Sequence, residues 1–351
     1  MRFVCVLLLE AQGARKEKRV CKKLVGTVSM QKLISKLGNL SRFFFRQERD
    51  KPDLIRAGLL LEAFEHYKHN DTLNQHGVDA FTERILSLDY DSLRSSVQNG
   101  LEEQVISIFR DVASHEAMIN GITSSTASKG VLSSSSNDQQ RNDTDPATAL
   151  VRQVGYDVIV RRSEIPHPQA GEGLFLRSDG RTVLPGTVLA LFPGLVHLAE
   201  YTRQKNYFHS LMPDKDLMML ARRDDVILDA RGANRVPWNP YALAHFINHP
   251  PQDAFPNVLQ VPFDFRADPL RIDEFPRDLR SLVPHTHAQP PTLTGTTERG
   301  VFMHSMAIIA ARPLEDGDEL LMDYRLLPNG PLPEWYHHFD EEEAAKRMEE
   351  Q

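Results

Sequence analysis

The first regular feature of the chain is a helical spacing of apolar residues between positions 53 and 120. Three stripes there place apolar side chains three or four positions apart, as on one face of an α-helix. Their members are Leu54, Ala57, Leu61 and Phe64, then Val78, Phe81, Ile85 and Leu88, then Leu93, Val97, Leu101, Val105 and Ile108. The pattern predicts a small helical region over residues 52–122, and the stripes are interpreted as packing surface.

The pattern stops in residues 123–149, which are rich in Ser, Asn, Asp and Gln and poor in bulky apolar residues. A segment of this composition cannot bury enough apolar surface to order itself. It predicts a disordered linker and a domain boundary.

Short runs of β-forming residues dominate from Tyr156 onward. They cover residues 157–161, 173–176, 188–192, 217–221, 226–228, 257–261 and 302–310. The two runs on either side of the turn at 223–225 predict a hairpin, and residues 239–247 hold a short helix-like cluster. Strands do not alternate with long helices, so a doubly wound parallel sheet is not expected. The predicted fold class is mainly β with short helices.

Charge divides the chain unevenly. Residues 1–51 form a basic N-terminal arm with 13 Lys and Arg against 4 Asp and Glu, while the remainder has 28 against 44. An acidic body suits a basic protein partner and argues against direct nucleic-acid binding. Residues 329–351 end in an acidic tail.

Cysteine usage and hydropathy bear on the compartment. Cys5 and Cys21 both lie in the arm, so no disulfide framework or cysteine-based zinc site is expected in the body. No apolar run is long enough to cross a membrane. The sequence predicts an intracellular protein of the nucleus or cytoplasm. Residues 30–49 also resemble a mitochondrial presequence, with a basic helix or disordered arm as the alternative.

Three short motifs stand out as candidate chemistry. Residues 170–175 read Ala-Gly-Glu-Gly-Leu-Phe, where glycines let the backbone approach a ligand or simply form a tight turn. Residues 245–250 read His-Phe-Ile-Asn-His-Pro, and the prolines that follow end any helix. Residues 317–324 read Gly-Asp-Glu-Leu-Leu-Met-Asp-Tyr, an acidic turn that leads into an apolar strand.

The histidines do not predict a metal site. His245 and His249 are four residues apart, but no Glu between them completes a metalloprotease motif. The remaining histidines lack metal-ligand spacing and are interpreted as surface or structural residues.

In their order and separation, the three motifs resemble the SET-domain family of protein lysine methyltransferases. The resemblance covers residues 150–328 and is nearest to the group called SET domain-containing protein 9. It rests also on the gap between Asn248 and Asn257 and on the Phe275-Pro276 pattern. It implies a SET-domain β-fold with a pseudoknot, preceded by the helical region.

The resemblance also implies a cofactor and site residues. S-adenosylmethionine would be held by Glu172, Gly173, Asn248, His249 and Tyr324, and Tyr324 would be the catalytic residue, with no metal. Phe192, Tyr201, Tyr207 and Phe246 are candidate walls of a lysine channel, and Trp335 or Tyr336 could stack on adenine. The expected substrate is a protein with an accessible lysine.

Two departures keep a second interpretation open. Pro250-Pro251 stands where the family usually has Ser-Cys, and the chain carries an extended insertion with the Phe275-Pro276 pattern. No cysteine-rich segment follows Tyr324, so a zinc-bound lid is not expected. The alternative is a SET-like fold with weak or no catalysis that serves as a binding or scaffold module.

Overall fold

A computed structural model describes residues 50–69, 75–127, 146–204, 206–207, 218–233, 239–267, 275–290, 300–326 and 332–339. At a coarse level the fold combines several small, mostly antiparallel sheets with helices, as the β-runs predict. The basic arm up to residue 49, with its presequence-like segment, lies outside the described residues.

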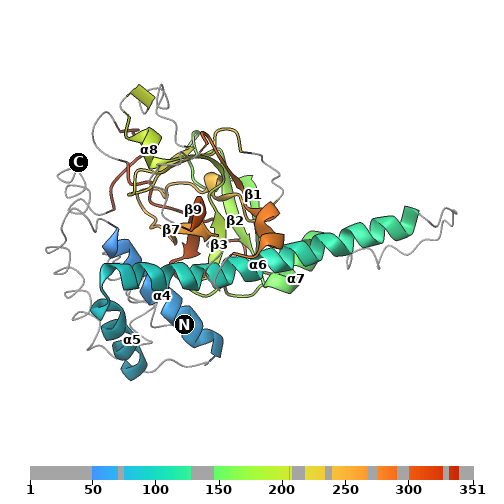
Figure 1. Ribbon diagram of the computed structural model, residues 1–351, viewed down its shortest axis with the longest axis horizontal. Helices are drawn as coiled ribbons and strands as arrows, with labels where there is room; N and C mark the ends of the chain where they lie inside the picture. Colours follow the sequence, from blue (N-terminus) through green and yellow to red (C-terminus); the bar gives the residue numbers. More distant parts are fainter. Residues whose placement is uncertain are drawn as a thin grey trace.

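Within the described residues, four α-helices precede the strands. They are α4 (Lys51–His69), α5 (Gln75–Ser87), α6 (Tyr90–Ala127) and α7 (Pro146–Val154). The three apolar stripes fall in α4, α5 and α6, so the predicted helices are confirmed. However, α6 has 38 residues and runs into the segment predicted as linker, of which residues 128–145 lie outside the described part. Figure 1 shows α6 crossing the strand region and extending past it.

The strands in the described part of the chain form three sheets. One pairs β1 (Asp157–Arg162) with β2 (Glu172–Arg177); another has the order β3 (Val188–Leu191), β9 (Val301–Ala310), β7 (Val258–Arg266). The third has the order β5 (Met219–Ala221), β6 (Ile227–Asp229), β4 (Gly194–His197), β8 (His285–His287), in which β4 and β8 are parallel. The predicted hairpin is confirmed as β5–β6. Short helices are α8 (Ala199–Thr202), η4 (Ala244–Phe246) and η5 (Arg277–Leu282).

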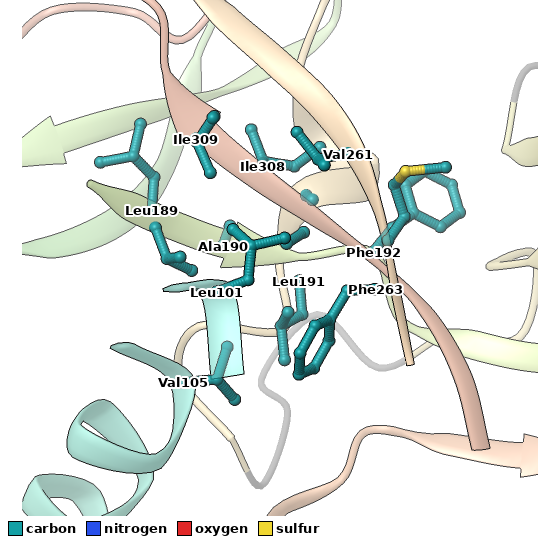
Figure 2. Packing of buried hydrophobic residues seen from close by; sticks show 14 of the residues in the cluster. Leu101, Val105, Leu189, Ala190, Leu191, Phe192, Val261, Phe263, Ile308 and Ile309 are labelled. Atoms are coloured by element: carbon teal, nitrogen blue, oxygen red, sulfur yellow. The ribbon is translucent and has the colours of Figure 1, made fainter. Parts of the chain in front are cut away.

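Helix α6 packs on the β3–β9–β7 sheet and shares its core. Leu101 and Val105 of α6 lie beside Leu189 and Leu191 of β3 and Phe263 of β7 (Figure 2), and all five are buried. Burying a side chain of this size stabilises a fold by about 1.5–3 kcal/mol. The buried apolar residues of the helices and of the strands belong to one cluster.

Two glutamines of α6 also satisfy the backbone at both edges of this sheet. Gln98 donates to Asp264 O at 2.7 Å and accepts from its N–H at 2.9 Å on β7. Gln104 donates to Gly186 O at 3.0 Å and accepts from Val188 N–H at 2.9 Å beside β3. Six helical residues rise about 9 Å, close to the roughly 9.6 Å between the outer strands of a three-stranded sheet. The helical region therefore completes the sheet and shares one core with the strands.

Candidate functional site

The three sequence motifs converge at the segment formed by residues 317–324. Its Leu320 N–H donates to Leu174 O of β2 at 2.8 Å, and its Met322 N–H donates to Asn248 O at 2.9 Å. Isolated bridges join Phe175 to Glu319 and Asn248 to Leu321. The segment thus lies between the glycine motif and the Asn-His motif, which are more than 70 residues apart in the sequence.

Asn248 connects all three motifs through its side chain. Its Nδ2 donates to Glu172 O at 3.0 Å and lies 3.3 Å from Glu319 Oε1. The chain leaves η4 at Ile247, which is extended, and Pro250 and Pro251 prevent the helix from resuming. The local sequence therefore turns Asn248 toward β2.

The Glu319 carboxylate accepts hydrogen bonds from residues of several segments, a role that the motif in the sequence did not predict. Its Oε1 accepts from Ser163 Oγ at 2.6 Å, and its Oε2 accepts from the Glu164 N–H at 2.8 Å. A Cβ placed on Gly173 would lie 2.2 Å from Glu319 Oε1. A side chain at Gly173 would therefore displace this carboxylate from its hydrogen bonds. The signal was present in the acidic turn of the third motif, but its partners are far away in the sequence.

Asn257 fixes the other side of the same segment. Its Nδ2 donates to Glu319 O at 2.7 Å, and its Oδ1 accepts from the Leu321 N–H at 2.7 Å. The side chain is buried, and it satisfies two backbone groups that no regular strand partner serves. This amide pairing holds the segment in the extended form that leads to Tyr324.

Tyr324 reaches the Asn-His motif from the end of the segment. Its hydroxyl donates to Ile247 O at 2.9 Å, and its N–H donates to His249 Nδ1 at 3.3 Å. Burial raises the pKa of the Tyr324 phenol to about 12. The hydroxyl is therefore protonated at neutral pH, and because its proton is directed at Ile247 O, the oxygen can accept a hydrogen bond from another donor.

His249 is buried among aromatic rings and is neutral. Its Nδ1 accepts from Tyr324, so its Nε2 is assigned the proton and donates to His337 O at 3.1 Å. Burial lowers the pKa of His249 to about 4, although Asp323 lies 3.9 Å away and opposes the shift. Neighbouring ring centroids lie at 4.5 Å (Tyr336) and 5.0 Å (Phe339).

The C-terminal residues 332–339 form the outer wall of this cluster. Trp335 is half-buried, with its ring 6.2 Å from that of Tyr324, and Tyr336 is buried. His337 is partly buried, yet neither of its ring nitrogens has a hydrogen-bond partner of normal geometry in the described residues. Burial also lowers the pKa of His337. An unsatisfied imidazole beside aromatic rings is chemically suited to a purine base, which stacks and forms hydrogen bonds.

The structure brings some predicted wall residues to the site and places others elsewhere. Phe246 is half-buried directly before Ile247, whereas Phe192 is buried in the core. Tyr201 and Tyr207 have ring centroids 5.8 Å apart, and the Tyr207 hydroxyl lies 2.8 Å from His197 Nδ1. These two tyrosines therefore form a cluster with His197 of β4.

Two classes of site are not found in the described residues. No group of three or more His, Cys, Asp or Glu side chains there could hold a metal ion. Within the same ranges, no helix has the length and hydropathy needed to cross a membrane.

A search of family models finds none that matches this chain, and a search of curated proteins finds no matching relative. The resemblance to the SET-domain family consequently rests on the three motifs and stays a prediction.

Proposed function

We propose that this chain is an S-adenosylmethionine-dependent protein lysine methyltransferase with a SET-domain fold. The observation that supports it best is the convergence of the three motifs: Asn248 touches the backbone of Glu172, and Tyr324 bonds to the neighbours of Asn248 on both sides. This agreement between a motif order in sequence and a meeting point in space is the basis of the proposal. The pseudoknot threading of the family is part of the same proposal.

The residues present fit the cofactor. Asn248 and the backbone at Glu172 and Gly173 would hold the amino acid end of the cofactor. His249 would lie beside its adenosine portion. Tyr336 offers a ring for stacking on adenine, and His337, whose ring nitrogens have no partner of normal geometry in the described residues, offers hydrogen bonds. The bound cofactor supplies a methyl group on a sulfonium sulfur.

The chain's own contribution is orientation of the lysine amine. The amine must be neutral to act as a nucleophile, and an ordinary lysine has a pKa of about 10.4. An aromatic, partly buried site favours the neutral amine by desolvation. The Tyr324 oxygen, whose proton is already donated to Ile247 O, would accept a hydrogen bond from the amine N–H and direct its lone pair at the methyl group.

The charge of the chain indicates the kind of partner in the same proposal. A protein with an accessible lysine in a basic stretch suits the acidic body of the chain. Direct nucleic-acid binding is not part of the proposal. Nucleus or cytoplasm remains the expected location, with a mitochondrial location as the alternative.

A second function, a binding or scaffold module without catalysis, is favoured by one observation. Asn248, Glu319 and Ser163 satisfy one another's polar groups, and the aromatic residues 335–339 pack on His249. A site that is so well satisfied on one side holds its shape without any ligand.

Calorimetry and methyl transfer together test the proposal. Chelator-treated full-length chain is titrated with S-adenosylmethionine, and labelled methyl incorporation is then measured with whole-cell extract proteins, followed by mass spectrometry. Metal-free binding with labelled lysines supports the enzyme. Binding without any transfer supports the scaffold function, and no binding at millimolar cofactor contradicts both the cofactor and the enzyme.

A further inference from the structure

The residue after Tyr324 is bound to the helical region by an ion pair. Arg325 donates from Nη2 to Asp53 Oδ1 at 2.7 Å and from Nη1 to Asp53 Oδ2, which makes the pair bidentate. Asp53 lies in the first turn of α4 and is 272 positions away in the sequence. This contact therefore joins the start of the helical region to the end of the third motif.

Asp53 is held in a fixed position by the helix that carries it. Asp53 is 4% exposed, and the neighbouring Leu54 and Ile55 anchor α4 in the shared core. Burial would raise the pKa of Asp53, but the charge and hydrogen bonds of Arg325, together with the charges of Arg56 and Arg223, outweigh it and lower the pKa to about 2. The carboxylate is therefore ionised at neutral pH, and the positive end of the α4 dipole adds to its stabilisation.

The backbone at Arg325 explains why a fixed partner matters. Arg325 has φ +53°, a left-handed conformation, and its N–H donates to Asp323 Oδ1 at 2.9 Å. This conformation costs a residue with a side chain about 1–2 kcal/mol. Such strain persists only where the surroundings impose it. The bidentate pair with Asp53 supplies that constraint directly after Tyr324.

We propose that Asp53 is a positioning residue for Tyr324, so that the helical region is part of the catalytic apparatus. By binding Arg325, Asp53 fixes the backbone turn directly after Tyr324. This turn keeps the Tyr324 hydroxyl in position to donate to Ile247 O and to accept a hydrogen bond from the lysine amine. This inference rests on the proposed methyltransferase function for its kinetic consequence. Its structural part, the control of Tyr324 by Asp53, does not depend on activity.

The kinetic test is a double-mutant cycle of Asp53→Asn and Tyr324→Phe in the full chain. Small misplacement of a reacting group costs up to about 100-fold in rate. We expect Asp53→Asn to lower the rate of labelled methyl transfer to extract proteins about 10-fold or more. The affinity for S-adenosylmethionine should change less than the rate, because Asn248 keeps its contacts with Glu172 and Glu319. In a Tyr324→Phe background, Asp53→Asn should cost almost nothing further.

A second ion pair between the helices and the sheet provides the matched control. Glu102 of α6 is also buried and pairs with Arg266 at the end of β7. Glu102→Gln should destabilise the protein to a similar degree without changing turnover per folded molecule. Should Asp53→Asn fail to fold, Arg325→Lys, which keeps the charge but not the bidentate geometry, takes its place in the cycle.

A spectroscopic readout separates this inference from the proposed function. The chain has 8 tyrosines, so Cζ-labelled tyrosine gives a simple NMR spectrum in which Tyr324→Phe identifies the Tyr324 signal. We expect Asp53→Asn to shift that signal and Glu102→Gln to leave it unchanged. An unshifted signal, unchanged turnover, or an equal loss in the Tyr324→Phe background would overturn the inference. A shifted signal in a chain whose wild type transfers no methyl group supports the positioning while the methyltransferase proposal fails.

Discussion

Two polar clusters of this molecule are built on opposite principles. The Arg222 cluster joins the β5–β6 hairpin to the β7–β9 pair. Arg222 Nη1 donates to Asp264 Oδ1 at 2.8 Å and to Ser305 O at 2.8 Å, and Nη2 donates to Asp224 Oδ2 at 2.6 Å. The Tyr324 cluster, formed by Tyr324, His249 and the rings of residues 335–339, holds neutral imidazoles among aromatic side chains.

The clusters differ in how completely their groups are satisfied. Burial would lower the pKa of Arg222 and raise that of Asp264. The carboxylates of Asp264 and Asp224 around Arg222, and Arg222 and His304 beside Asp264, together outweigh burial and shift both pKa values the opposite way. In the Tyr324 cluster, burial prevails and keeps His249 neutral, while His337 has both ring nitrogens unsatisfied among the described residues. A cluster that connects two parts of a fold is stable when each of its buried charges is paired. Unsatisfied neutral groups beside aromatic rings are what a ligand site needs.

The largest effect is expected from Tyr324→Phe, which tests the Tyr324 cluster as a catalytic site. The ring and its packing remain, and only the hydrogen bond to Ile247 O and the acceptor oxygen are lost. We expect methyl transfer to fall by about 10²–10⁴, while the unfolding free energy falls by no more than about 1 kcal/mol. Single-turnover assays and urea titration measure the two quantities. Full activity in the folded variant would remove Tyr324 from the mechanism.

Arg222→Met tests the Arg222 cluster as a structural joint. The variant leaves Asp264 buried without its main cation, which typically costs about 3–5 kcal/mol of stability. Urea denaturation should show this loss, while turnover per folded molecule stays near that of the wild type. The double variant Arg222→Met/Asp264→Leu should recover much of the loss, since it removes the orphaned charge. A loss below about 1 kcal/mol would contradict the assigned role.

The local periodicity of apolar residues was sufficient to predict the helices and strands, but it could not predict the contacts between them. The stripes through Leu54, Val78 and Leu93 predict helices because each helix buries one face. The pairing of Gln98 and Gln104 with two strand edges could not be predicted, because it depends on where α6 crosses the sheet. The same limit applies to the length of α6, since residues 123–127 read as linker but continue the helix.

The candidate site was predictable where a motif is short and was missed where partners come from several elements. Asn248, His249 and Tyr324 were identified together, and the structure brings them into contact. Glu319, Asn257 and His337 were not assigned roles, because their partners lie on other segments. Asp53 carried no signal at all, since only the folded chain places it beside Arg325.

Asn248→Ala tests the residue next to the Tyr324 cluster that is proposed to hold the cofactor. The variant removes the amide that bonds to Glu172 O and contacts Glu319. Loss of this partly buried partner costs about 1–3 kcal/mol, so the Kd for S-adenosylmethionine should rise more than about tenfold in a folded protein. Ser163→Ala is the matched control, because it removes another bond to the Glu319 carboxylate. Calorimetry showing equal affinity in both variants and the wild type would reject the Asn-His assignment.

The smallest expected effect is a pH dependence that tests whether His249 is neutral in the folded state. Burial lowers the pKa values of His249 and His245 to about 4 from an ordinary value of 6.5. Between these values the unfolded chain binds protons that the folded chain does not, so stability is complete above about pH 6.5 and falls as the pH decreases toward 4. The pKa of Asp264 is instead lowered below its ordinary 3.8, so its contribution is lost only in more acidic solution. Urea titrations from pH 8 to pH 4.5 should therefore show an early loss from the histidines, and His249→Gln should reduce the proton uptake on unfolding by about one. Equal slopes for the variant and the wild type would show that His249 is charged in the folded state, and the contrast between a neutral site and a charged joint would fail.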